Sequence, residues 1–281
     1  MESEITHRAA VLGSPVGHSL SPALHRAGYA GAGLTGWTYE RIDCDAAALP
    51  GLVAGSGPDW AGFSVTMPGK SAAAAMADVR SPRVTALGVA NTLVRRDGGW
   101  LAENTDVDGL IGALRAAGRP APKSVLVLGG GGTCAAVLAA LAELGTSEVV
   151  IAGRRPASTA AALELAERLG LPIRAIGWDV GVIGAAADVA DLVVSTVPEG
   201  AADALADRLA AVPTLFDVIY HPWPTPLALA GRPGRVTVTG LDMLLHQAFR
   251  QFELITGAPA PVEAMRLGLL AGAKTDLPLP V

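Results

Sequence analysis

The stretch SVLVLGGGGTCAAVLAALAELG, residues 124–145, indicates the fold of this chain. An apolar run leads into the glycines Gly129 to Gly132, and an Ala- and Leu-rich segment of helical composition follows. Gly129 permits a tight turn, Gly131 lets the backbone approach a pyrophosphate, and Cys134 takes the third, small position of the G-x-G-x-x-[G/A] pattern. Since the next apolar run, SEVVIAG, completes a β-α-β unit, we predict dinucleotide binding with phosphate over the helix N-terminus.

The residues that end the SEVVIAG run distinguish between the two nicotinamide cofactors. An enzyme that uses NAD usually carries Asp or Glu at this strand end, where the acid binds the ribose 2′-hydroxyl. This chain has Gly153, Arg154 and Arg155 there, and two adjacent guanidinium groups suit a 2′-phosphate. We therefore predict NADP, while a pair of solvated arginines is the alternative. The cofactor contacts predicted from these two segments are Gly129, Gly130, Gly131, Gly132, Thr133, Arg154 and Arg155.

Apolar runs alternate with Ala- and Leu-rich segments along the rest of the chain. The runs RAAVLG, WTYERI, GFSVT, DLVVST, TLFDVI and RVTVTG are typical of short strands. This alternation predicts an α/β fold with parallel sheets, helices on both faces and ligands at the carboxyl ends of strands. We expect an α/β substrate domain of residues 1–105, completed by helices in residues 242–281, and a Rossmann-type doubly wound domain of residues 106–241. The active site is expected in the cleft between the domains.

Composition excludes several classes of function. The 281 residues are 51% hydrophobic and 17% charged, which excludes a disordered chain. The net charge of −5 arises from scattered charges of both signs, so we expect neither nucleic acid nor a membrane as a partner. Cys44 and Cys134 lack CxxC spacing, and His18, His25 and His246 lack metal-ligand spacing, so no metal is predicted. We expect a cytoplasmic protein that acts on a small molecule as a monomer or homodimer.

Rare polar residues mark a second candidate site. The chain has two Asn, two Gln and three Lys, against 18 Arg. Lys70, Asn91 and Asp106 fall in three short segments, GFSVTMPGK, GVANTL and ENTDVDG. A Lys and an Asp that share a site can pass a proton to or from a reacting oxygen. We predict that Lys70 and Asp106 are the catalytic pair; the alternatives are a surface lysine and a helix-capping aspartate.

These segments, with GSPVGHSLSPALH at residues 13–25 and GLDMLLHQAFRQFELITG at residues 240–257, resemble the shikimate dehydrogenase family along most of the chain. In that family the first segment holds the carboxylate of shikimate through two serines, which by position are Ser19 and Ser21. The resemblance further implies substrate contacts at Thr66, Asn91, Tyr220 and Gln247. It also implies that the nicotinamide lies beside Val218, Gly240 and Met243.

The resemblance implies the reversible reduction of 3-dehydroshikimate to shikimate with NADPH, in which Lys70 donates a proton and Asp106 orients it. An NAD-dependent quinate/shikimate dehydrogenase and a non-catalytic ligand-binding relative are the alternatives. Gln251, one turn after Gln247, is expected to be structural. The positions that depart from the family pattern are Ser64, Gly153 and Ser195, each in place of Asn, and Arg155 in place of Thr.

Overall fold

The computed structural model describes residues 4–281, which form two compact α/β units. Residues 4–109 and Leu244–Leu279 make up the first unit, and Leu110–Met243 make up the second. Residues 106–109, expected in the second domain, group with the first unit because Asp106 contacts Lys70 and Asn91 there. Residues 242–243 group with the second unit.

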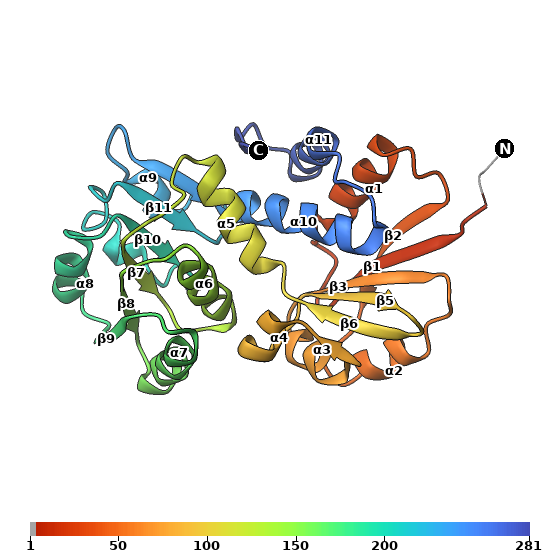
Figure 1. Cartoon of the computed structure of the whole chain (residues 1–281). Coiled ribbons are helices and arrows are strands. Elements are labelled where there is room, and N and C mark those ends of the chain that lie inside the picture. The colour runs from red at the N-terminus through yellow and green to blue at the C-terminus, as the bar shows by residue number, and fades with distance from the viewer. Residues whose placement is uncertain (1–3) are drawn as a thin grey trace. The chain divides into compact units, whose positions relative to one another are not determined.

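The first unit contains a mixed, six-stranded sheet (Figure 1). Its strands are β1 (His7–Gly13), β2 (Trp37–Asp43), β3 (Trp60–Val65), β4 (Val79–Arg80), β5 (Thr92–Arg96) and β6 (Gly99–Glu103). Their order is β2-β1-β3-β5-β6-β4, and β1, β2 and β3 run parallel. The expectation of parallel pairing is wrong for β5, which is antiparallel to both β3 and β6.

A two-residue turn, Asp97-Gly98, explains the antiparallel pairing of β5 with β6. Both residues have positive φ, 40° and 82°, as a type I′ hairpin turn requires. Arg96 and Gly99 pair across the turn. The Asp-Gly dipeptide between the runs TLVRR and GWLAE is a hairpin signal, although neither run was among the expected strands.

Helices cover both faces of this first sheet (Figure 1). On one face lie α1 (Ser21–Gly31), α11 (Val262–Ala273) and the part of α10 (Gly240–Thr256) that belongs to this unit. On the other face lie α2 (Leu49–Ala54), α3 (Lys70–Met76) and α4 (Pro82–Leu87). The buried residues Leu49, Phe63 and Leu93 belong to the core on this second face.

The second unit contains an all-parallel sheet with the strand order β12-β11-β10-β7-β8-β9. Its strands are β7 (Ser124–Leu128), β8 (Glu148–Gly153), β9 (Ile173–Gly177), β10 (Leu192–Ser195), β11 (Thr214–Asp217) and β12 (Val236–Thr239). The central strands β7 and β10 are buried along nearly their whole length, which suits the continuous apolar runs of a parallel sheet covered on both faces. The predicted Rossmann-type architecture is confirmed.

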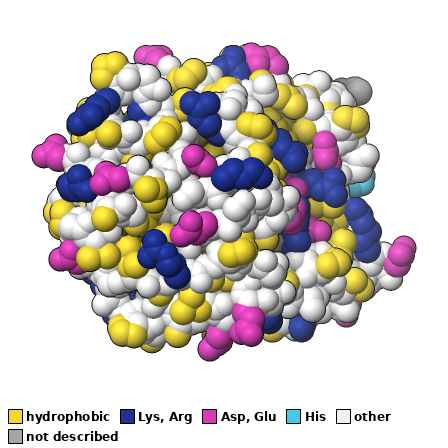
Figure 2. Space-filling view, turned by 60° about the vertical axis from the view of Figure 1, so that its left-hand side comes forward, with side chains coloured by type: hydrophobic (Ala, Val, Ile, Leu, Met, Phe, Trp, Pro, Cys, Tyr) yellow, Lys and Arg dark blue, Asp and Glu magenta, His cyan; other side chains and the backbone are white. Residues whose placement is uncertain are grey.

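Helices and one short 3₁₀ turn cover the second sheet. They are the part of α5 (Asp106–Ala116) that belongs to this unit, α6 (Gly132–Glu143), α7 (Pro156–Leu169), α8 (Val180–Ala187), η1 (Asp203–Leu205) and α9 (Pro226–Leu229). α6 packs against α7, whereas Ile183 of α8, Leu205 of η1 and Leu227 of α9 share a core with Leu215 of the sheet. Among residues 4–281, no helix combines the length and the apolar character needed to cross a membrane. Figure 2 shows basic and acidic side chains interspersed on one face of the molecule.

Candidate active site

Lys70 and Asp106 form an ion pair in the first unit, in which Lys70 Nζ donates to Asp106 Oδ2 at 2.6 Å. Each is the first residue of a helix, Lys70 of α3 and Asp106 of α5. The Asp106 side chain is 12% exposed and the Lys70 side chain 26% exposed. The pair is thus shielded from bulk water on most sides, yet the ammonium group is open to a ligand. This arrangement suits proton transfer to a bound oxygen.

Asn91 holds the other oxygen of the Asp106 carboxylate. Its Nδ2 donates to Asp106 Oδ1 at 2.9 Å, and its own Oδ1 accepts the backbone N–H of Thr105 at 2.8 Å. Asn104 Oδ1 accepts the backbone N–H of Asp106 at 3.2 Å. Sequence reasoning did not assign Asn104 to the site, although its rarity as an Asn was a usable signal. Both oxygens of the carboxylate are therefore fixed by protein groups.

Gln247 of α10 completes this polar cluster. Its Oε1 accepts from Thr105 Oγ1 at 3.2 Å and from Asn91 Nδ2 at 3.4 Å, while its Nε2 donates to the carbonyl of Leu244 at 3.0 Å. The structure thus brings four of the residues predicted from the sequence into one cluster of the first unit: Lys70, Asn91, Asp106 and Gln247.

Of the two predicted serines, Ser21 is the first residue of α1 and Ser19 lies two residues before it. Ser19 is partly exposed and Ser21 is buried, and the backbone N–H of Ser21 donates to Ser19 Oγ at 3.3 Å. Arg41 Nη2 donates to the carbonyl of Ser19 at 2.6 Å, a contact that sequence reasoning missed because the partners lie on separate elements. A guanidinium group therefore fixes the backbone of the serine segment.

Thr66 follows β3 and packs against the end of β1. A Cβ at Gly13 would collide with the Thr66 side chain, so only glycine permits this approach. The backbone N–H of Thr66 donates to the carbonyl of Leu12 at 2.8 Å, and its carbonyl accepts the N–H of Gly69 at 2.9 Å. These bonds form the turn that leads into Lys70.

The glycine turn of the second unit has the shape that a phosphate group needs. Gly129 has φ 95°, and a Cβ there would lie 2.8 Å from Val197 Cγ1. At Gly131 and Gly132, in contrast, a Cβ would meet no atom within 4 Å, so the space over the turn is open. No side chain caps the N-terminus of α6, and the first N–H groups of a helix have no partner within it.

Arg154 and Arg155 are exposed at the end of β8, and Arg155 is the residue before α7. β8 is the parallel neighbour of β7, so its carboxyl end lies on the same edge of the sheet as the glycine turn. Burial raises the pKa of Cys134 to about 12, so its thiol stays neutral and acts as a small packing group. An open glycine turn with two exposed guanidinium groups beside it fits a dinucleotide that carries a 2′-phosphate.

The residues expected beside the nicotinamide also belong to the second unit. A Cβ at Gly240 would collide with the carbonyl oxygen of Val218 and would lie 3.0 Å from Tyr220 Cδ1. The structure therefore brings Val218, Tyr220 and Gly240 together. Burial raises the pKa of Tyr220, so its hydroxyl stays protonated near neutral pH. Met243 is 9% exposed.

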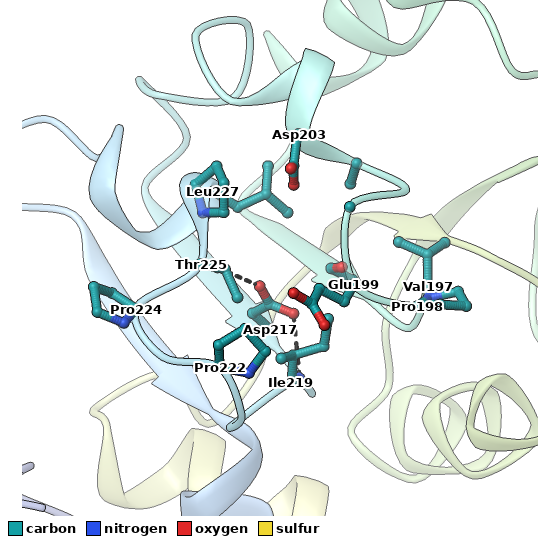
Figure 3. Close-up of a pocket in the computed structure, with 14 residues that line it drawn as sticks. Val197, Pro198, Glu199, Asp203, Asp217, Ile219, Pro222, Pro224, Thr225 and Leu227 are labelled. Carbon is teal, nitrogen blue, oxygen red and sulfur yellow. Dashed lines mark hydrogen bonds between the residues drawn. The ribbon is translucent and has the colours of Figure 1, made fainter.

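Asp217 precedes Val218 and Tyr220 and organises the loop that carries them; Figure 3 shows its hydrogen bonds to Thr225 and Ile219. Its Oδ2 accepts from Thr225 Oγ1 at 2.7 Å, and its Oδ1 accepts the N–H of Ile219 at 3.3 Å. Burial raises the pKa of Asp217, while hydrogen bonds from Thr225, Ile219 and Ser195 oppose this shift. Ser195, which departs from the family pattern, thus supports Asp217. These residues line a pocket of about 180 Å³.

Comparisons with known proteins find relatives along most of the chain. Residues 11–93 match the shikimate dehydrogenase substrate binding domain, and residues 240–266 match the shikimate 5′-dehydrogenase C-terminal domain. The chain is 40% identical to the shikimate dehydrogenase (NADP(+)) of Methylobacterium radiotolerans over 273 residues, which cover 92% of this chain and 94% of that relative.

Solved structures give the same result. The shikimate dehydrogenase of Mycobacterium tuberculosis shares 50% identity with this chain at a TM-score of 0.90, and the match covers 94% of this chain and 99% of the other. The shikimate 5-dehydrogenase of Thermus thermophilus, solved in complex with NADP(H) and shikimate, shares 33% identity at a TM-score of 0.80, with coverage of 95% and 99%.

Proposed function

Because this chain belongs to the shikimate dehydrogenase family, we propose that it catalyses the reversible, NADPH-dependent reduction of 3-dehydroshikimate to shikimate, a step of aromatic amino-acid biosynthesis. The observation that carries this proposal is the ion pair of Lys70 Nζ with Asp106 Oδ2 at 2.6 Å. A non-catalytic relative would not need an acid–base pair that is partly shielded and still open to a ligand.

The acid–base step depends on Lys70. In the reducing direction its ammonium group donates a proton to the substrate carbonyl oxygen, and in the oxidising direction the neutral amine takes the proton back. Asp106 holds Nζ in place and is itself held by Asn91. The cofactor supplies the hydride when it is bound. The ion pair therefore provides the proton at the oxygen where negative charge develops.

The remaining polar groups of the first unit orient the substrate. Asn91, Gln247 and Thr66 offer donors and acceptors to ring hydroxyls, and Ser19 and Ser21 offer hydroxyl donors to the carboxylate. The contact of Arg41 with the Ser19 carbonyl supports this assignment, since it holds the serine segment in place. Tyr220 of the second unit is a further proposed substrate contact.

The second unit holds NADP in this proposal. The turn from Gly129 to Thr133 binds the pyrophosphate, and Arg154 and Arg155 bind the 2′-phosphate. Val218, Gly240 and Met243 adjoin the nicotinamide. The open space over Gly131 and Gly132 supports the pyrophosphate assignment. A cytoplasmic location and a monomeric or homodimeric state are further proposals; the two free, buried cysteines agree with a reducing compartment.

A two-by-two activity test checks this function. Shikimate and quinate are each offered with NADP and with NAD, and absorbance of the reduced nicotinamide is followed. We expect the highest kcat/KM for shikimate with NADP. A preference for quinate or NAD would favour a quinate/shikimate dehydrogenase, and no turnover in any combination would favour a non-catalytic relative.

A further inference from the structure

A buried row of hydrogen bonds extends from the acid–base pair into the interior of the first unit. Asp106 Oδ1 accepts from Asn91 Nδ2 at 2.9 Å. Asn91 Oδ1 accepts from Thr92 Oγ1 at 2.9 Å, and Thr92 Oγ1 accepts from Gln251 Nε2 at 2.9 Å. Gln251, whose expected role was structural only, is therefore connected to Asp106 through two side chains. Its Nε2 also donates directly to the backbone carbonyl of Asn91 at 3.2 Å.

The row continues beyond Gln251 to Ser64 and Tyr39. Gln251 Oε1 accepts from Ser64 Oγ at 2.8 Å, and the Tyr39 hydroxyl lies 2.5 Å from Ser64 Oγ. The amide oxygen of Gln251 can only accept, so the single hydroxyl proton of Ser64 is donated to Gln251 Oε1. The Tyr39 hydroxyl must therefore donate to Ser64 Oγ. Each hydrogen bond of the row consequently donates in the direction of Asp106.

The members of the row are closed off from solvent. Tyr39 and Thr92 are 0% exposed, and Gln251 is 2% exposed. The imidazole of His25 stacks on the Tyr39 ring at 4.2 Å between centroids. Burial raises the pKa of Tyr39, and the hydroxyls of Ser64 and Ser21 oppose that shift only in part, so Tyr39 keeps its proton. In such surroundings a donor or acceptor that loses its partner is costly.

The row bears on the orientation of the Asn91 carboxamide. Asn91 Oδ1 accepts two hydrogen bonds at less than 3 Å, one from the Thr105 backbone and one from Thr92 Oγ1. Gln251 Nε2 donates to the Thr92 hydroxyl, and this bond helps to keep the hydroxyl proton directed at Asn91. Without the Gln251 amide, the Thr92 hydroxyl is less restricted, and one of the bonds that keep Asn91 Nδ2 directed at Asp106 weakens.

We propose that Gln251 and Thr92 are positioning residues for the reaction: they hold the Asn91 carboxamide in the orientation that presents its NH₂ group to Asp106. The inference rests on the proposed function of the Lys70–Asp106 pair. Since the Thr105 backbone also holds Asn91, loss of the row weakens catalysis without abolishing it. We expect a loss of about tenfold in kcat/KM for shikimate, because one hydrogen bond in a buried site is involved.

Two substitutions at position 92 separate positioning from packing. Thr92→Val keeps the shape of the side chain and removes its hydroxyl, whereas Thr92→Ser keeps the hydroxyl and removes a methyl group. We expect Thr92→Val to lower kcat/KM for shikimate about tenfold and Thr92→Ser to stay within about threefold of the wild type. NADP affinity is unchanged in both. The reverse order of activities would show that Thr92 acts by packing and would overturn the proposal.

A double substitution tests whether Gln251 acts through Thr92. Gln251→Leu alone should lower kcat/KM for shikimate about as much as Thr92→Val, and the double variant should be no worse than the poorer single variant within about threefold. If the two losses in kcat/KM multiply, Gln251 acts independently of Thr92, for example through its bond to the Asn91 carbonyl, and the proposal that it acts through Thr92 is overturned. Thr256→Val is the matched control, because the Thr256 hydroxyl on the same helix donates only to the Phe252 carbonyl, at 2.7 Å, and we expect wild-type activity.

The outcomes also separate this inference from the proposed function. A wild-type protein that binds NADP but does not oxidise shikimate contradicts the proposed function. An active wild type whose Thr92→Val and Gln251→Leu variants match it in kcat and KM contradicts the positioning role alone. Thermal unfolding of each variant identifies any loss of activity that follows from a loss of folded protein.

Discussion

Gly240 and Val218 lie so close together that a Cβ at position 240 would collide with the carbonyl oxygen of Val218. Gly240 is the first residue of α10, and Val218 follows the last residue of β11. Only a residue without a side chain permits this approach of two backbone segments. The contact fixes the backbone on which the proposed nicotinamide site depends.

Gly240→Ala should therefore lower both stability and NADP affinity. We expect a loss of about 2–3 kcal/mol in the free energy of unfolding, typical of overpacking against backbone. Gly51→Ala is the control, because a Cβ there meets no atom within 4 Å and Gly51 lies within α2. Urea unfolding and NADP titration measure both effects. Equal stability of the two variants would contradict the close contact.

Lys70→Ala should lower kcat for shikimate oxidation by about 10²–10⁴-fold and leave shikimate affinity largely intact, because proton transfer matters mainly in the transition state. Lys70→Arg keeps the charge but not a transferable proton, so its activity should also collapse. Lys123→Ala, at an exposed lysine of the second unit, is the control. An effect confined to KM, or an active Arg variant, would reduce Lys70 to an electrostatic anchor.

Arg154→Glu should weaken NADP binding by tenfold or more while NAD binding changes little, because a charge-assisted contact of about 1.5–3 kcal/mol becomes a repulsion. Arg232→Glu makes the same change of charge at another position of the second unit and should leave the preference for NADP intact. Dissociation constants for both cofactors provide the comparison. Unchanged NADP affinity in Arg154→Glu would refute the 2′-phosphate assignment.

Ser19→Ala and Ser21→Ala should each weaken shikimate binding, since a hydrogen bond to a charged group contributes about 1.5–3 kcal/mol. Both variants should also discriminate less between shikimate and an analogue with a neutral carboxamide in place of the carboxylate. NADP affinity serves as the folding control. If both variants discriminate between shikimate and the carboxamide analogue as well as the wild type does, the two serines do not hold the shikimate carboxylate.

His25 predicts a pH dependence of stability. Burial lowers its pKa from 6.5 to about 4, and no neighbour among the described residues meets hydrogen-bond geometry with its ring, although Gln251 opposes the shift in part. The unfolded chain therefore takes up a proton at a higher pH than the folded one. Stability is complete above pH 6.5 and falls as the pH approaches 4, by about 3 kcal/mol in total.

Urea unfolding between pH 7.5 and pH 4 measures this contribution. Carboxylates also titrate in this range, so the wild type is compared with His25→Phe, which keeps an aromatic ring and cannot be protonated. The variant should lose less stability on acidification. His18→Phe, at an exposed histidine, should retain the wild-type dependence. Parallel curves for wild type and His25→Phe would contradict a buried neutral imidazole.

Local patterns predicted the parts of this protein that depend on neighbours in sequence. The glycine turn from Gly129 to Gly132 lies between β7 and α6 as expected, and the α/β architecture and family membership are confirmed. Lys70 and Asp106 are in contact, as the sequence led us to expect, whereas their roles stay predictions. The hairpin at Asp97-Gly98 was missed because the alternation of strands and helices favoured parallel pairing everywhere.

Contacts between distant residues could not be predicted where no motif marks both partners. Ser64 and Gln251 are 187 positions apart, and nothing near either residue indicates the other. The same holds for Arg41 and Ser19, whose contact depends on how α1 and β2 pack. The polar groups of such pairs find their partners only after the chain has folded, so a single sequence reveals the residues without their connections.

The first unit is discontinuous in sequence, which imposes an order on folding during synthesis. Residues 110–243 form their own sheet, so during translation this middle segment has all its strands before the first unit can close. α1 packs against α11, and Gly28 packs against the Phe252 side chain, so these contacts form only after the C-terminal helices have been synthesised. Gln247 and Gln251 of α10 are likewise synthesised after the middle segment. A chain that ends at residue 243 would therefore contain every strand of the second sheet but lack α11 and most of α10, which complete the first unit.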